Sequence, residues 1–391
     1  MADVNSEHPN PDAHSGNRLT EARRVVVKIG SALLVDPGTG RLNDSWFQSL
    51  VEDLANMRSR GQDVLVVSSG AIALGRGHLG LGTGNLRLEQ SQAAAAAGQI
   101  RLAHAWQEAL ARHEIPVAQV LVTLSDTEER RRYLNARGTL ETLLGLGAVP
   151  VINENDTVAT EEIRYGDNDR LAARVAQMVS GDCLVLLSDV DGFYTADPGS
   201  NPAARLMTEI SDITPEIESM AGESATDVGS GGMITKIAAA RIALRAGCHM
   251  VIASGHESHP IQAIETGVRC SWFVARSSPA SVRKQWIAGT LKPRGELVVD
   301  EGAAAALADG KSLLPAGVIE VRGDFQRGDA VIVRDGSGRE LAHGLVAYSA
   351  PAARRIIGRR SGEVPDILGY RGPDELIHRN DLAMNRRMNS R

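Results

Sequence analysis

The chain has 391 residues, of which 43% are hydrophobic and 23% are charged, a balance typical of globular proteins. We expect two domains, because a single core rarely grows beyond ~250–300 residues. The formal net charge of −6 gives no overall attraction to phosphate backbones, so any nucleic-acid contact would need a local basic patch. No run of about 18 apolar residues occurs, so the sequence predicts no membrane contact.

The cysteines and the first residues indicate where the protein works. Cys183, Cys248 and Cys270 are odd in number, far apart and set in apolar runs. This pattern is typical of reduced core cysteines in a cytoplasmic protein and indicates neither disulfides nor a zinc site. Residues 1–20 lack the basic-then-apolar order of a signal peptide and are predicted to be a disordered tail.

In chain order, the first predicted element is a β-branched strand at residues 25–30, and Lys28 interrupts it near its carboxyl end. Such a lysine either extends to the rim of the sheet or faces an anion. An amphipathic helix at 44–61 and a second buried strand at 64–67 follow. Small residues come next, and the hydroxyl of Ser69 could approach a ligand there.

The glycines at positions 75, 77 and 80 fit the dinucleotide-binding pattern G-x-G-x-x-G. We reject this interpretation, because they lie several residues past the strand, do not open a helix directly and lack the expected acidic residue downstream. Helices at 89–112 and 128–146, with a strand at 117–123 between them, are predicted to follow.

The chain then reaches an apolar strand that breaks into a loop rich in Asn, Asp and Glu, within residues 151–170. Polar residues just past a buried strand lie where open α/β sheets bind ligands. Carboxylates suit an ammonium group or a lysine, and amides suit a carboxylate or hydroxyl, so this loop could bind a small zwitterion. The alternative is a solvated turn cluster. The polar residues are Asn153, Asp156, Asp167, Asn168 and Asp169.

A helix at 171–181 and a strand ending at Ser188 and Asp189 come next. Glycines within 229–232 then precede a helix that carries Lys236 in its first turns. Such a loop is suited to phosphate, although a flexible linker is the alternative. Lys236 favours the phosphate site, because a cation near a helix start is unfavourable unless an anion is expected.

The alternation of strands and helices predicts an α/β fold with a mostly parallel sheet sandwiched by helices, which strands at 250–254 and 270–275 complete. After residue 293 the sequence changes to short strand patterns separated by turns, which predict a small, mainly-β, barrel-like domain with one short helix. Its basic run at 354–360 is local, because residues 295–374 carry ten Lys and Arg against twelve Asp and Glu. The predicted boundaries are a tail at 1–20, the α/β domain at 21–285, a linker at 286–294, the small domain at 295–374 and a frayed tail at 375–391.

The sequence offers little for hydrolysis or metal chemistry. His256 and His259 miss the H-E-x-x-H spacing by one residue and are predicted to be neutral surface histidines, and no G-x-S-x-G elbow occurs. Two lysines, two glycine-containing turns and an acidic loop at one sheet edge instead predict phosphoryl transfer, which depends on positioning and positive charge.

Six ordered motifs between residues 25 and 236 resemble one family, and the resemblance continues in register through the C-terminal part to about residue 374. The chain is similar to the glutamate 5-kinases of the amino acid kinase family, many of which carry a C-terminal PUA domain. The resemblance implies the amino acid kinase fold, ATP and Mg²⁺ as cofactors, and L-glutamate as the substrate of the first step of proline synthesis. The motifs are VVVKIGS, SSGAIALG, VPVINENDTV, YGDNDRLAA, LLSDVDGFYTADP and GSGGMITK.

The resemblance also implies residue roles. Lys28 and Lys236 would contact the transferring phosphoryl group, and Asp169 would hold both lysines. Glutamate would be bound by Ser69, Asp156, Asn168 and, by our extension, Asp167. Beside the two lysines, the nucleotide would be bound by Gly30, Ser31, Ser188, Asp189, Ser230, Gly231, Gly232, Met233, Ile234 and Thr235. The family often has Thr-Ser where this chain has Ser31 and Ala32, and Thr in place of Ser188; both changes keep a hydroxyl in the first position.

The expected partners follow from the same resemblance. They are L-proline as a feedback inhibitor, further copies of the chain in a dimer or tetramer, and glutamate-5-semialdehyde dehydrogenase as recipient of the labile product. Because no acidic cage is evident, we expect the nucleotide phosphates to hold Mg²⁺. Two alternatives stay open: a kinase for aspartate or N-acetylglutamate, and an RNA-binding protein led by its PUA-like domain.

Overall fold

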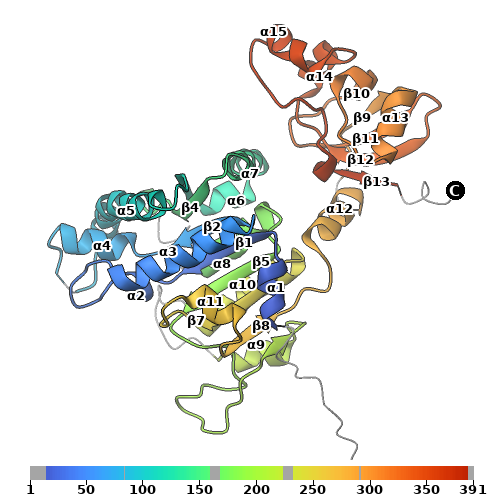
Figure 1. The fold of residues 1–391 in the computed structure, drawn as a ribbon. Helices are drawn as coiled ribbons and strands as arrows, with labels where there is room; N and C mark the ends of the chain where they lie inside the picture. Colours follow the sequence, from blue (N-terminus) through green and yellow to red (C-terminus); the bar gives the residue numbers. More distant parts are fainter. Residues whose placement is uncertain (1–14, 83, 159–167, 223–231, 290–291, 386–391) are drawn as a thin grey trace, which may run out of the picture. The chain divides into compact units, whose positions relative to one another are not determined.

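The computed structural model describes residues 15–82, 84–158, 168–222, 232–289 and 292–385 (Figure 1). The chain forms two compact units, residues 1–279 and 280–391. Part of the predicted N-terminal tail, residues 1–14, lies outside the described residues, as do Asp167, Ser230 and Gly231. Within the described residues, no helix is both long enough and apolar enough to cross a membrane.

The first unit is built on an eight-stranded sheet with the order β3-β4-β2-β1-β5-β7-β8-β6. Its pairs are parallel except β7 with β8, so the predicted mostly parallel sheet is confirmed, although β8 runs against its neighbour β7. The strands are β1 (Arg24–Ile29), β2 (Asp63–Ser68), β3 (Val117–Val122), β4 (Val149–Glu154), β5 (Cys183–Ser188), β6 (Glu209–Ile210), β7 (His249–Ser254) and β8 (Cys270–Phe273).

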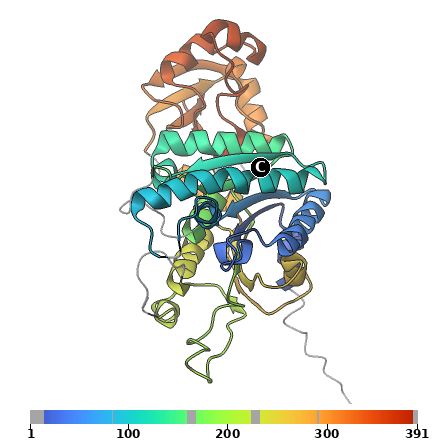
Figure 2. The same ribbon diagram turned by 90° about the vertical axis from the view of Figure 1, so that its left-hand side faces the viewer.

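Helices cover both faces of this sheet, and each face has its own hydrophobic core. Figure 2 shows the edge strand β3 between α5 on one face and α7 on the other. The helices are α1 (Ser15–Glu21), α2 (Ser31–Leu34), α3 (Asp44–Ser59), α4 (Ala71–His78), α5 (Leu88–Ala111), α6 (Leu124–Glu128), α7 (Arg130–Gly145), α8 (Asn168–Met178), α9 (Pro215–Met220), α10 (Met233–Arg245) and α11 (Pro260–Glu265). The predicted sandwich is therefore confirmed.

Alternation of side chains along the strands assigns residues to these two cores. In β1, Val25 and Val27 pack with α3 and α5, whereas Val26 packs with α8 and α10. Lys28 has the same parity as Val26 and therefore lies on the α8 and α10 face. The three cysteines are buried and free, as expected.

Helix α4 was not expected, and it explains the rejected glycine pattern. Gly75 and Gly77 lie within α4 and do not open it. A Cβ on Gly75 would come within 1.8 Å of the Ala94 carbonyl oxygen, and one on Gly98 within 1.7 Å of the Ala71 carbonyl oxygen. These glycines let the backbones of α4 and α5 touch, which fixes α5 against the segment that follows β2.

The second unit holds a five-stranded sheet with the order β10-β9-β11-β12-β13, in which β9 and β11 are parallel and the other pairs antiparallel. The strands are β9 (Gly295–Val299), β10 (Val318–Gly323), β11 (Ala330–Asp335), β12 (Glu340–Leu345) and β13 (Leu382–Met384). The prediction of a mainly-β domain is confirmed, but the domain contains more helices than the one short helix that was predicted. The described residues of this unit include α13 (Glu301–Ala308), α14 (Ala350–Ile356), α15 (Val364–Leu368), the 3₁₀ helices η2 (Pro315–Gly317), η3 (Ser361–Glu363) and η4 (Arg379–Asp381), and, from Ala280, most of α12 (Pro279–Gly289).

Both predicted tails contain ordered structure. Helix α1 occupies residues 15–21, and Leu19 is fully buried in the core. At the other end, Leu376 and Ile377 are buried and β13 pairs with β12. In the predicted linker, Ile287 packs against the small sheet. These segments are too short to show a hydrophobic periodicity, so the sequence did not predict their structure. They are ordered by burial against residues distant in the sequence.

The basic run of the second unit is tied to its own backbone. Arg354 donates to the carbonyl oxygen of Gly323, and Arg355 donates to that of Ile367. These contacts give both guanidinium groups a structural role within the unit.

Candidate active site

Strands β1, β2, β4 and β5 are parallel neighbours, so their carboxyl ends meet at one edge of the sheet. Lys28, Ser69 and Ser188 lie at or just past three of these ends. Helices α8 and α10 begin at Asn168 and Met233, and their first turns carry Asp169 and Lys236. This edge is where a parallel α/β sheet binds its ligands.

At the centre of this edge, one carboxylate holds two lysines. Asp169 is 0% exposed, and its Oδ1 lies 2.5 Å from Lys28 Nζ. Its Oδ2 lies 3.1 Å from Lys236 Nζ. Thr235 also donates to Oδ2, over 3.3 Å. The predicted trio of Lys28, Asp169 and Lys236 is thus brought together from β1, α8 and α10.

The charges of this trio do not cancel. Burial by itself would raise the pKa of Asp169, but the two lysine charges outweigh burial and hold that pKa below its usual value. Lys28 and Lys236 are only 8% and 3% exposed, and within this trio two ammonium groups contact one carboxylate. The excess positive charge, poorly screened by water, favours the arrival of an anion such as a phosphoryl group.

A chain of hydrogen bonds lies beside the lysines and links four polar side chains. Asn168 Nδ2 donates to Ser69 Oγ over 2.7 Å and to Asn153 Oδ1 over 3.0 Å. Asn153 Nδ2 in turn donates to Gln99 Oε1 over 2.9 Å. The predicted pair of Ser69 and Asn168 is therefore in direct contact.

The direction of this chain is fixed by a backbone group. The N–H of Glu154 can only donate, and it donates to Asn153 Oδ1 over 2.9 Å, so that atom is the oxygen of the amide. Asn168 must then turn its Nδ2 toward Asn153 and Ser69. Within the described residues, the Asn168 Oδ1 acceptor and the Ser69 hydroxyl hydrogen are left for a ligand. One acceptor and one donor side by side suit an ammonium and a carboxylate.

The predicted nucleotide residues that the structure describes lie at the ends of β1 and β5 and at the start of α10. Gly30 and Ser31 begin α2 directly after β1, while Ser188 ends β5 and donates to Asp189 over 2.8 Å. Gly232 caps the start of α10, where Met233, Ile234 and Thr235 form the first turn. Asp156, a predicted substrate residue, lies on the turn after β4 and is half-buried.

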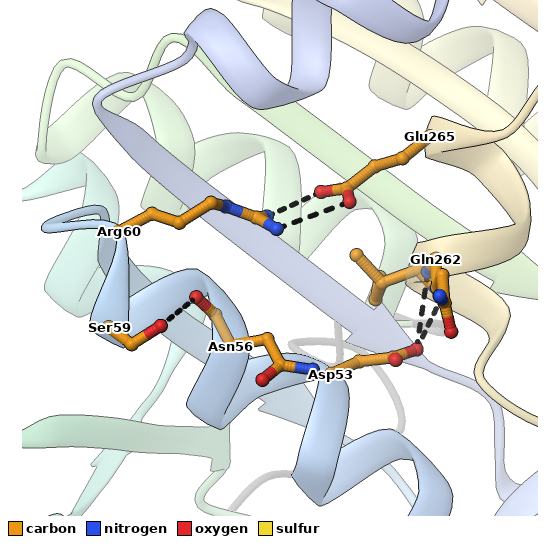
Figure 3. Close-up of a pocket in the computed structure, with 7 residues that line it drawn as sticks. Asp53, Asn56, Ser59, Arg60, Gln262 and Glu265 are labelled. Carbon is orange, nitrogen blue, oxygen red and sulfur yellow. Dashed lines mark hydrogen bonds and ion pairs between the residues drawn. The ribbon is translucent and has the colours of Figure 1, made fainter.

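A polar cavity of about 240 Å³ lies elsewhere, between α3 and α11, and contains none of the predicted site residues (Figure 3). Asp53 accepts hydrogen bonds there from the backbone N–H groups of Ile261 and Gln262, over 2.9 and 3.3 Å. His259 Nδ1 lies 3.1 Å from Asp53 Oδ1, so this histidine, predicted to lie at the surface, contacts an acid. Within the described ranges, no group of three His, Cys, Asp or Glu could hold a metal ion.

Sequence reasoning placed Asn153 among the polar residues that could bind a small zwitterion, without a specific role, and it did not name Gln99 at all. Asn153 carries a signal, because it interrupts a fully buried strand. Gln99 carries a weaker one: it is a polar residue, 8% exposed, on the buried face of α5 that also includes Ala95 and Leu102.

The fold and the lysine cluster define the class of protein as an α/β phosphotransferase. Residues 23–254, more than half of the chain, match the amino acid kinase family, and residues 295–368 match the PUA domain. The chain is 64% identical over 366 residues to a glutamate 5-kinase of Paramagnetospirillum magneticum, covering 94% of this chain and 99% of that relative. It is 60% identical to a glutamate 5-kinase of Agrobacterium fabrum, again over 94% of this chain and 94% of the relative. The chain belongs to the amino acid kinase family and, within it, to the glutamate 5-kinases.

Proposed function

We propose that the protein phosphorylates the side-chain carboxylate of L-glutamate with ATP, giving L-glutamyl 5-phosphate and ADP, the first step of proline biosynthesis. The observation that carries the proposal is the buried trio of two lysines and one aspartate beside a polar pair suited to an amino acid. The names of its relatives support the choice of glutamate.

Lys28 and Lys236 would donate to the oxygens of the γ-phosphoryl group as it moves between the two substrates. Asp169 would keep both ammonium groups in place before ATP binds, since like charges in a buried site would otherwise separate. Preorganised positive charge of this kind stabilises the charge that develops in phosphoryl transfer.

The amino-acid end of glutamate would lie against Ser69 and Asn168. The Ser69 hydroxyl would donate to the α-carboxylate, and Asn168 Oδ1 would accept from the α-ammonium. Asp156 and Asp167 would add carboxylates for the ammonium. A free α-ammonium gives these acids a partner, which an N-acetylated substrate lacks.

The chemistry needs no general base, because the side-chain carboxylate of glutamate, with a pKa near ~4.3, is already ionised at neutral pH. One carboxylate oxygen forms a bond to the γ-phosphorus, and the bond from that phosphorus to the β,γ-bridging oxygen breaks, leaving ADP. Lys28 and Lys236 are cations and cannot ligate a metal ion. The site therefore fits an Mg²⁺ ion that is bound mainly to the nucleotide phosphates. There the ion would neutralise phosphate charge. Ser188, Asp189 and the start of α10 at Gly232 would hold the nucleotide.

The proposal includes feedback inhibition by L-proline, assembly into dimers or tetramers, and hand-over of the labile acyl phosphate to glutamate-5-semialdehyde dehydrogenase. Likeness to the glutamate 5-kinases supports these three parts. A cytoplasmic setting is supported by three buried cysteines that are free thiols.

The test is hydroxamate formation from L-glutamate, Mg-ATP and hydroxylamine, which traps an acyl phosphate. We expect colour with L-glutamate, little with L-aspartate or N-acetyl-L-glutamate, loss of colour in Lys236→Ala, and less colour with L-proline. Equal activity on glutamate and N-acetylglutamate would remove the role given to Asp156 and Asp167. Activity on aspartate alone would keep the reaction but reject the substrate.

A further inference from the structure

Gln99 lies outside every motif used above, yet it ends the hydrogen-bonded chain that begins at Ser69. We propose that Gln99 is a positioning residue, which orients the amides of Asn153 and Asn168 for the amino-acid end of the substrate. The inference rests on the proposed function, because it concerns the subsite that Ser69 and Asn168 would form.

The contacts of Gln99 point to this role. Its side chain is 8% exposed, and its Oε1 accepts from Asn153 Nδ2 over 2.9 Å. Its Nε2 makes no hydrogen bond within the described residues. A half-satisfied buried amide costs stability relative to an apolar side chain of the same size. The one polar contact that Gln99 makes in this part of the chain is therefore the reason for an amide here.

The helix that carries Gln99 is held close to the Ser69 segment. Gly98, its neighbour, packs so closely on the Ala71 carbonyl oxygen that no Cβ would fit. Further along α5, Trp106 Nε1 donates to Ser68 Oγ over 3.3 Å. These contacts place Gln99 Oε1 at a fixed position relative to the residues on both sides of Ser69.

Two hydrogen bonds from opposite sides fix the orientation of the Asn153 amide. The Glu154 N–H fixes the oxygen end of the Asn153 amide, and Gln99 Oε1 fixes its nitrogen end. Without the second anchor, a buried N–H of Asn153 loses its partner, and the amide can rotate away from Asn168. Asn168 would then no longer present its oxygen beside the Ser69 hydroxyl. Asp169 holds both lysines, and the contacts given above join neither lysine to the amides of Gln99, Asn153 and Asn168. Binding of ATP should therefore be unaffected.

The test compares Gln99→Leu, Gln99→Glu and a matched control, Gln107→Leu, in the full-length protein. Gln107 lies on the same helix and is exposed. We expect Gln99→Leu to raise KM for glutamate about tenfold, the effect of losing one net hydrogen bond, while KM for ATP and the melting temperature stay near those of the control.

Gln99→Glu supplies the readout that a merely structural residue would not give. A protonated Glu is neutral and keeps the carbonyl acceptor, whereas an ionised one adds negative charge beside a site for carboxylates. Burial raises the pKa of such a carboxyl group toward the assay range. We expect the ratio of its glutamate KM to that of the wild type to fall toward one as the pH is lowered.

An unchanged glutamate KM in folded Gln99→Leu would overturn the inference, as would equal increases in both KM values together with a lower melting temperature. If Gln99→Leu does not fold, the pH profile of Gln99→Glu decides, and a flat ratio rejects the inference. Wild-type activity on another amino acid would reject only the glutamate assignment, and the same KM comparison would then be made with that substrate.

Discussion

The first unit holds two buried aspartates in opposite electrostatic surroundings. Asp169, 0% exposed, is paired with two lysines, and although burial opposes it, their charges lower its pKa. Asp53, 3% exposed, accepts two backbone N–H groups and contacts His259. Burial raises the pKa of Asp53, and these hydrogen bonds do not fully offset it.

The comparison separates a site built for a ligand from a contact built for the fold. Asp53 joins α3 to the start of α11 and has partners suited to a single carboxylate. Asp169 instead contacts two lysines, although one lysine would already neutralise that carboxylate. Clusters of buried charges are costly to desolvate and are common at functional sites.

The largest expected effect comes from breaking the lysine cluster. Lys28→Met keeps most of the side-chain volume and removes one cationic donor to the phosphoryl group. We expect kcat in the hydroxamate assay to fall about 100- to 1,000-fold, as for the loss of one preorganised donor. Thermal unfolding should change little, because Lys236 still neutralises Asp169.

The control for this variant is Lys311→Met, at an exposed position of the second unit. It should leave kcat and the melting temperature unchanged. A normal kcat in Lys28→Met would mean that the excess charge at Asp169 serves no catalytic purpose.

The second prediction concerns Asp53. Asp53→Ala removes the acceptor of two backbone N–H groups and should lower the free energy of unfolding by about 1–3 kcal/mol for each group left unsatisfied. Asp53→Asn keeps an acceptor oxygen and should cost less. Urea unfolding followed by tryptophan fluorescence measures this, because Trp46, Trp106 and Trp272 all lie in the first unit. Both variants should keep wild-type KM values, and a raised KM for either substrate would contradict the division between the two regions.

The smallest effect is a difference in pH dependence, with one pKa unit corresponding to about 1.4 kcal/mol. The ordinary pKa of both aspartates is 3.8. The folded pKa of Asp169 is lower, so its contribution to stability is present above pH 3.8 and is lost as the pH falls through the folded value. The folded pKa of Asp53 is raised, so its contribution is present below pH 3.8 and is lost as the pH rises through the folded value.

The measurement is the free energy of unfolding between acid and neutral pH for wild type, Asp169→Asn and Asp53→Asn. The difference between wild type and Asp169→Asn should grow as the pH rises, and the difference between wild type and Asp53→Asn should shrink. Changes of the same sign in both variants would reject the contrast between the two aspartates.

Much of the fold and of the central trio was predictable from the sequence. Continuous apolar and β-branched runs identified the strands, and Lys28 stood out in a strand that should be apolar, with the rim of the sheet or an anion as its two possible targets. Lys236 was identified by its unfavourable position at a helix start, which Asp169 explains. These signals are local, since each depends on neighbours within a few residues.

The tertiary structure decided what local patterns could not carry. Gln99 and Asn153 are 54 residues apart, Ser69 and Asn168 are 99 apart, and Asp53 meets Ile261 across 208 residues. Helix α4 has the composition of a glycine-containing loop and became a helix by packing closely on α5. The sequence by itself determined the layers, the lysines and the family resemblance, because periodicity and motif order are written along the chain. Which amide turns toward which hydroxyl was decided only by packing, because that direction depends on atoms from four separate elements.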